Sequence, residues 1–97
     1  MQNVAAGLRA AAAELEADLA RLLQATTREQ GRFAEFEARA MAAIHNGDDD
    51  AARDALVAQQ ASLDTLKELD ADATVVRASL AECRAVLDQM PSAEQPG

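Results

Sequence analysis

Residues 45–50, His-Asn-Gly-Asp-Asp-Asp, separate two long stretches made almost entirely of residues that favour helices. The pair Asn46-Gly47 favours the left-handed backbone conformation with which many helices end. Asp48 is a candidate N-cap for a following helix, and the next two aspartates place negative charge at its positive end. Both prolines of the chain lie in its last seven residues, beyond these stretches. The sequence therefore predicts an all-α fold in which two long helices form an antiparallel coiled-coil hairpin.

The expected boundaries follow from these breaks. The hairpin is predicted to occupy residues 1–90, with a first arm at about 4–45, a turn at Asn46, Gly47 and Asp48, and a second arm at about 49–90. Pro91 cannot continue a helix comfortably, so residues 91–97 are expected to form a disordered tail.

The weak point of the first arm is the polar segment 26–31, which contains Gly31. A continuous helix is favoured because one internal glycine costs only about 1 kcal/mol and the segment contains no proline. A break into two helices is the alternative.

Leucines recur in both arms at the spacing of a coiled-coil seam, in steps of three and four residues. The predicted seam consists of Leu8, Leu15, Leu19 and Leu22 in the first arm and of Leu66, Leu69, Val76, Leu80, Cys83 and Leu87 in the second. Before Leu66 the register is expected to slip, because Leu56 and Leu63 do not lie on the same line. Folding the arms about Gly47 makes facing residue numbers add to 94–95, so that Leu15 faces Leu80.

The composition predicts a thin core. Hydrophobic residues make up 49% of the chain, but much of this is alanine, and the only aromatic residues are Phe33 and Phe36. Alanine favours helices and buries little apolar area. Because two helices shield only one side of each apolar stripe, we expect a homo-oligomer, assembled as a helical bundle, or docking on a protein partner.

The charge of the chain excludes some classes of partner. The formal net charge is −8, and no run of basic residues is present, so nucleic-acid binding is not expected. No window approaches the roughly 18 continuous apolar residues of a membrane span. The N-terminus lacks the pattern of a secretory signal, so a cytoplasmic location is predicted.

A search for chemistry predicts no enzyme, no catalytic residue, no metal site and no cofactor. His45 and Cys83 are the only residues of their types, too few for a zinc site or a Cys/His nucleophile pair. His45 suits the negative end of the first helix, and Cys83 suits the core, with a redox thiol as its alternative. Residues 48–50 fit helix capping better than a calcium loop, because Ala52 stands where a ligand would be required. Phe33 and Phe36 are core residues near the turn or, alternatively, an exposed contact for a partner.

The sequence around the turn resembles the phage shock protein A family. The residues that carry the resemblance are Glu-Ala-Arg-Ala-Met-Ala-Ala at 37–43 and Gly-Asp-Asp-Asp-Ala-Ala-Arg-Asp-Ala-Leu-Val-Ala-Gln-Gln at 47–60. The resemblance implies a long helical hairpin that polymerises, attaches peripherally to the inner membrane under stress and binds an AAA+ transcriptional activator. Membrane association stays open here, because the polar face of residues 4–23 mixes acidic and basic side chains.

The expected function is that of a non-enzymatic, self-associating coiled coil similar to the hairpin of that family, acting as a scaffold or regulator in the membrane stress response. Its expected location is the cytoplasm, with the inner-membrane surface as the extension that the resemblance implies. The alternative is a small helical adaptor or chaperone, similar to flagellar export chaperones, that binds a partner helix.

Overall fold

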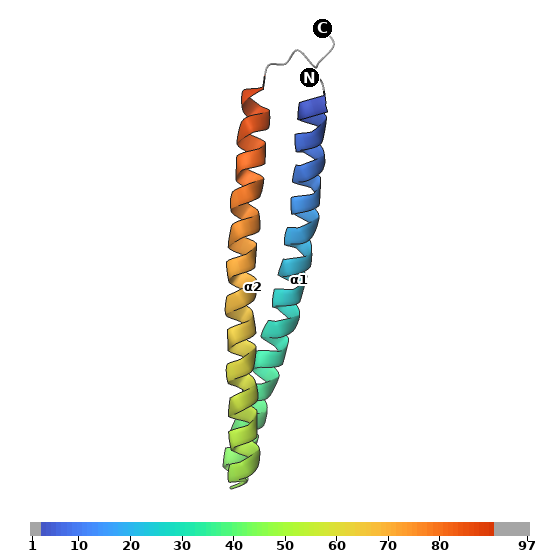
Figure 1. Cartoon of the computed structure of the whole chain (residues 1–97). Coiled ribbons are helices and arrows are strands. Elements are labelled where there is room, and N and C mark those ends of the chain that lie inside the picture. The colour runs from blue at the N-terminus through green and yellow to red at the C-terminus, as the bar shows by residue number, and fades with distance from the viewer. Residues whose placement is uncertain (1–2, 91–97) are drawn as a thin grey trace.

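The computed structural model describes residues 3–90 of the chain and contains two helices (Figure 1). Helix α1 spans Asn3–His45 and helix α2 spans Asp49–Gln89. They lie antiparallel along most of their length, joined by a short turn at the end far from both termini (Figure 1). The predicted all-α antiparallel hairpin is confirmed. The predicted tail, residues 91–97, lies outside the described residues, as do residues 1–2.

Helix α1 is continuous over its 43 residues, including the polar segment 26–31. The hydroxyl groups of Thr26 and Thr27 donate to the carbonyl oxygens of Leu22 and Leu23, at 2.9 and 3.1 Å. These side chains therefore find their acceptors one turn back, within the helix itself. At 1.5 Å per residue the helix is about 65 Å long, and the break considered above does not occur.

The turn is closed by a Schellman motif at the end of α1. The backbone N–H of Asp48 donates to the carbonyl of Ala43 at 2.9 Å, and that of Gly47 donates to the carbonyl of Ile44 at 3.1 Å. Gly47 has a φ of 72° and is the only residue of the described chain with a positive φ. Asn46 instead keeps a helical bond to Ala42, so the expectation that it shares the left-handed conformation is wrong.

Asp48 ends one helix and begins the next. Its carboxylate oxygen accepts the backbone N–H of Ala51 at 3.0 Å, which is the side-chain bond of an N-cap. Its carbonyl accepts from the N–H of Ala52 at 3.0 Å, the first helical bond of α2. A linker of only three residues thus satisfies backbone groups of both helices and holds the first turn of α2 beside the last turn of α1.

The facing positions of both helices follow an unbroken heptad pattern. In α1 they alternate in steps of three and four residues from Ala5 to Ala43. In the second arm they run from Ala52 of α2 to Met90, the C-cap residue of α2, and all are buried or half-buried. The expected slip before Leu66 is wrong. The seam continues toward the turn through small or polar residues, and Leu56, 50% exposed, lies beside it.

Two contacts between the helices define their register. Ser62 hydrogen-bonds to Glu29, and Arg84 forms an ion pair with Glu16, so that contacting residue numbers add to 91 and to 100. Residues that face each other directly across the seam have numbers that add to 94–95. The sums of 91 and 100 lie on either side of this value, as expected for contacts between neighbouring layers of the seam. Charges that flank the seam therefore meet across the two helices at definite places.

Candidate interaction surfaces

The predicted seam residues all lie on the sides of the helices that face each other. Leu80 is buried, at 5% exposure, and the other nine are half-buried. The buried positions between them are mainly alanines. This division follows from geometry, because a two-helix seam encloses a methyl group completely but leaves the outer part of a leucine uncovered on one side.

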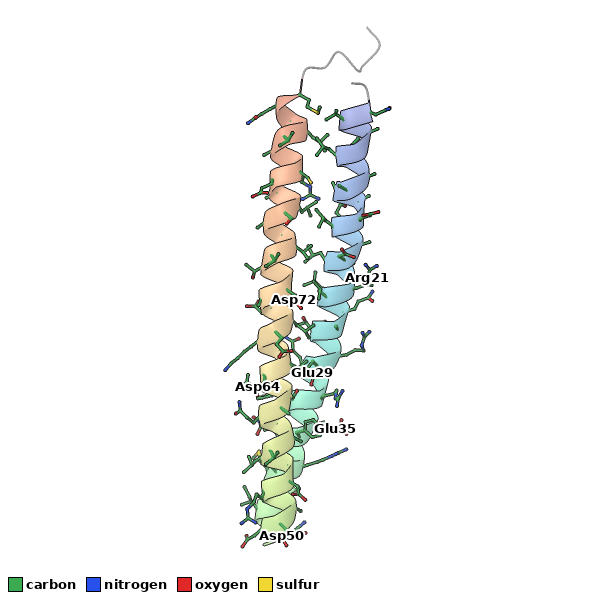
Figure 2. The ribbon with its side chains drawn as sticks, viewed as in Figure 1. Arg21, Glu29, Glu35, Asp50, Asp64 and Asp72 are labelled. Carbon is green, nitrogen blue, oxygen red and sulfur yellow. The ribbon has the colours of Figure 1, made fainter. Side chains whose placement is uncertain are left out.

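The middle of the seam contains a polar link between the helices. The hydroxyl of Ser62 donates to a carboxylate oxygen of Glu29 at 2.5 Å, and Arg32 lies 3.9 Å from the other carboxylate oxygen. The Glu29 side chain is only 13% exposed, and Figure 2 shows it where the two helices meet. Glu29 belongs to the polar segment 26–31 noted in the sequence, but Ser62 was not predicted, because Leu63 beside it suggested a different register. A polar pair of this kind specifies register in coiled coils.

A shallow groove of about 200 Å³ lies next to this link, lined by Glu29, Arg32, Phe36, Ala58, Ala61, Ser62 and Thr65. Its volume is below the roughly 300–1,000 Å³ of small-molecule pockets. The lining contains one carboxylate and one guanidinium group, and the Ser62 hydroxyl in it is the donor to the Glu29 carboxylate described above.

Phe33 and Phe36 lie on the seam and are half-buried. Phe36 also lines the groove, with the guanidinium carbon of Arg39 5.7 Å from the centroid of its ring. The rings therefore pack toward α2 and keep part of their surface accessible. Contact of these rings with a partner stays a prediction.

Large apolar side chains are exposed near the turn instead. Met41 is 67% exposed, Ile44 62%, Leu56 50% and Val57 65%. Hydrophobicity alone would favour the core for Ile44 and Leu56. Their heptad positions, one residue beyond a seam position in each case, place them on the edge of the hairpin.

Acidic and basic side chains four residues apart in a helix can pair, at positions 35 and 39, 49 and 53, and 84 and 88, but the structure forms only the first of these pairs. Arg39 pairs with Glu35 at 2.7 Å, as their spacing of four residues predicts. Arg53 lies 3.4 Å from Asp50 rather than pairing with Asp49, and Arg84 lies 3.5 Å from Glu16 of the other helix rather than pairing with Asp88. These groups are well exposed, so each pair contributes little to stability.

The remaining candidate residues do not form a chemical site. His45 is exposed as the last residue of α1, and Cys83 is a half-buried free thiol in the seam. Among residues 3–90, no group of three or more His, Cys, Asp or Glu side chains is arranged to hold a metal ion. Neither described helix contains a stretch long and apolar enough to cross a bilayer.

Comparison of the chain with protein-family models, with curated proteins and with solved structures found no match. The class of the protein is therefore defined by its fold alone. It is a long antiparallel two-helix hairpin, and its outer surfaces are the candidate sites of interaction.

Proposed function

We propose that this protein is a non-enzymatic, self-associating coiled-coil hairpin that serves as a scaffold. The observation that carries the proposal is the imbalance between its core and its surface. Leu80 is the only large apolar side chain that the described hairpin buries almost completely, the other seam leucines are half-buried, and eight large apolar side chains are exposed by 44–67%. A chain that buries mostly methyl groups gains little from folding alone, and a second copy supplies the missing apolar contact.

The resemblance of residues 37–60 to the phage shock protein A family supports a more specific form of this proposal. In that form the hairpin is the assembling part of a membrane-stress scaffold or regulator, located in the cytoplasm or at the surface of the inner membrane. The sequence similarity at the turn is its support.

The molar mass in solution tests self-association. Sedimentation equilibrium and circular dichroism melting from about 1 to about 100 μM should give a dimer or larger species, with a melting temperature that rises with concentration. A helical monomer over the whole range, melting at one temperature, would refute the proposal.

An adaptor that binds a partner helix is the second candidate function. The observation that favours it is the exposed apolar edge at the turn, made by Met41, Ile44 and Leu56. Ile44 and Leu56 have the same relation across the hairpin as Glu16 and Arg84, whose side chains approach to 3.5 Å. Such an edge suits the apolar face of an amphipathic helix.

Capture of one stoichiometric partner would support the adaptor, if Ile44→Asp abolishes the capture and Ala78→Asp on the far side of α2 does not. Ile44 suits this test better than Phe36. Ile44 lies outside the seam, so substitution of Ile44 leaves the seam intact, whereas Phe36 is a half-buried seam residue. A chain that captures only its own copies would count against the adaptor.

A further inference from the structure

Helix α1 presents a second line of residues on the side away from α2, which we call the outer face of α1. It starts at Ala6, Ala10 and Ala13 and continues in alternating steps of four and three residues to Met41 and His45. Every residue on this line is exposed, and none is an aspartate, glutamate, lysine or arginine. At about 100° per residue, the line lies roughly 150° around the helix from the seam.

The equivalent line of α2 is different. It contains Asp50, Arg53, Asp64, Lys67 and Asp88, as expected of a helix face that remains in water. Figure 2 shows two of these, Asp50 near the turn and Asp64 further along the helix. Two helices of nearly equal length in one hairpin thus have unlike outer surfaces, and only that of α1 is free of charge from end to end.

Larger apolar side chains extend the outer face of α1. Met41 lies on it, and Leu23 and Ile44 border it, with exposures of 67%, 44% and 62%. Helix α2 has a similar arrangement, because Val57 lies on its equivalent line and Leu56 and Val75 border that line. The outer face of α1 therefore differs from that of α2 in its lack of charged residues.

The charge balance also selects α1 as the face on which copies meet. Helix α1 has six acidic and five basic side chains, a net charge of −1, whereas α2 has nine acidic and four basic, a net charge of −5. Two copies that met through α2 would bring together two strongly acidic helices. Contact through α1 keeps the acidic helices on opposite sides of the assembly.

The charges that flank the outer face complement a second copy of the same face. In a parallel, in-register pair, a residue on one flank meets the residue five positions later on the opposite flank of the partner helix. Arg9 then meets Glu14 of the second copy, and Glu16 meets Arg21 of the second copy. Within one chain Glu16 also pairs with Arg84, and Arg21 with Asp18, so these contacts would extend existing ion pairs. Two-fold symmetry doubles both contacts, and none of the other flanking pairs joins like charges. A fully overlapping antiparallel pair would also bring Arg21 near Glu35, but it would place Arg28 against Arg28 of the second copy, a like-charge contact that the parallel pair avoids.

We propose that the outer face of α1 binds α1 of a second copy in a parallel, in-register pair, with α2 of each copy outside. This inference rests on the self-association proposed above and names its surface. A helix about 65 Å long and about 10 Å wide offers roughly 650 Å² per copy, close to the roughly 800 Å² per partner of a standard interface. The small side chains along the face allow the two α1 backbones to approach closely.

A matched pair of substitutions tests the face. Ala17→Glu places a carboxylate on the line of residues that forms the proposed interface, and Ala78→Glu places the same group at the same heptad position on the outside of α2. In sedimentation equilibrium, Ala17→Glu should weaken association by about tenfold or more, and Ala78→Glu should change it by no more than about twofold. Unchanged helical circular dichroism would show that both variants fold.

Equal weakening by both substitutions, or weakening by Ala78→Glu alone, would overturn the assignment to α1 while leaving self-association intact. A wild-type chain that is monomeric at every concentration would instead remove the proposed function itself.

Cross-linking tests the direction of the pair. In a Cys83→Ala background, Ala13→Cys should form a disulfide-linked dimer rapidly on mild oxidation, because the two copies of position 13 face each other in a parallel pair. Ala78→Cys in the same background is the control and should not. Cross-linking of Ala13→Cys only when it is mixed with Ala38→Cys would show an antiparallel pair and overturn the proposed direction.

Discussion

Truncation of Leu80 is the sharpest test of the energetics of the seam. Leu80 is the most completely buried large side chain of the described hairpin, at 5% exposure. Leu80→Ala removes three carbon atoms, worth about 2.4 kcal/mol of transfer free energy at about 0.8 kcal/mol each. The part of the cavity that does not collapse adds to this cost, so the expected loss in the free energy of unfolding is about 3 kcal/mol, within the range measured for such substitutions.

Leu56→Ala is the matched control. The chemical change is the same, but Leu56 is 50% exposed and lies beside the seam, so about half of the transfer free energy is lost and no cavity forms. Alanine is also the better helix former, which offsets part of that loss. The expected net destabilisation is below about 1 kcal/mol.

Urea unfolding followed by circular dichroism measures both variants. All chains must be compared at one protein concentration, because self-association adds to apparent stability. A midpoint shift with an unchanged dependence on urea would show a change in stability alone. Equal losses for the two variants would refute the assignment of Leu80 to the seam and Leu56 to its edge.

Three further substitutions probe the polar link and the turn by the same measurement. Ser62→Ala should lower the free energy of unfolding by about 1–2 kcal/mol, because the Glu29 carboxylate loses a hydrogen-bond donor. Adding Glu29→Leu should recover most of that loss. A larger loss in the double variant would contradict this account. Gly47→Ala should cost about 1 kcal/mol through its φ of 72°, since no atom lies within 4 Å of an added Cβ; an unchanged midpoint would argue against the left-handed turn. Asp48→Ala should lower the free energy of unfolding by about 1 kcal/mol, because the N–H of Ala51 loses its cap. Asp48→Ser should retain most of the stability, because serine is also a good N-cap. Equal losses for the two variants would exclude capping.

Much of this architecture is local chemistry and could be predicted from the sequence. Gly47 and Asp48 end and begin helices through their own backbone and side-chain bonds, so their roles did not depend on distant residues. The leucine spacing likewise indicated which side of α1 is covered. The surface proposed for self-association is also a sequence pattern, but its exposure on the side away from α2 is known only from the fold.

The sequence by itself determined two long helices, the place where the chain reverses and the seam between the termini and Leu66. Only the tertiary structure decided the seam near the turn, where Ala52 and Ala55 are buried and Leu56 is exposed. The physical reason is the three-residue linker, which fixes the heptad positions that face each other whatever the size of the residues there. The tertiary structure also decided that Arg84 pairs with Glu16 rather than with a neighbour in its own helix, because that pairing depends on the register of the two helices.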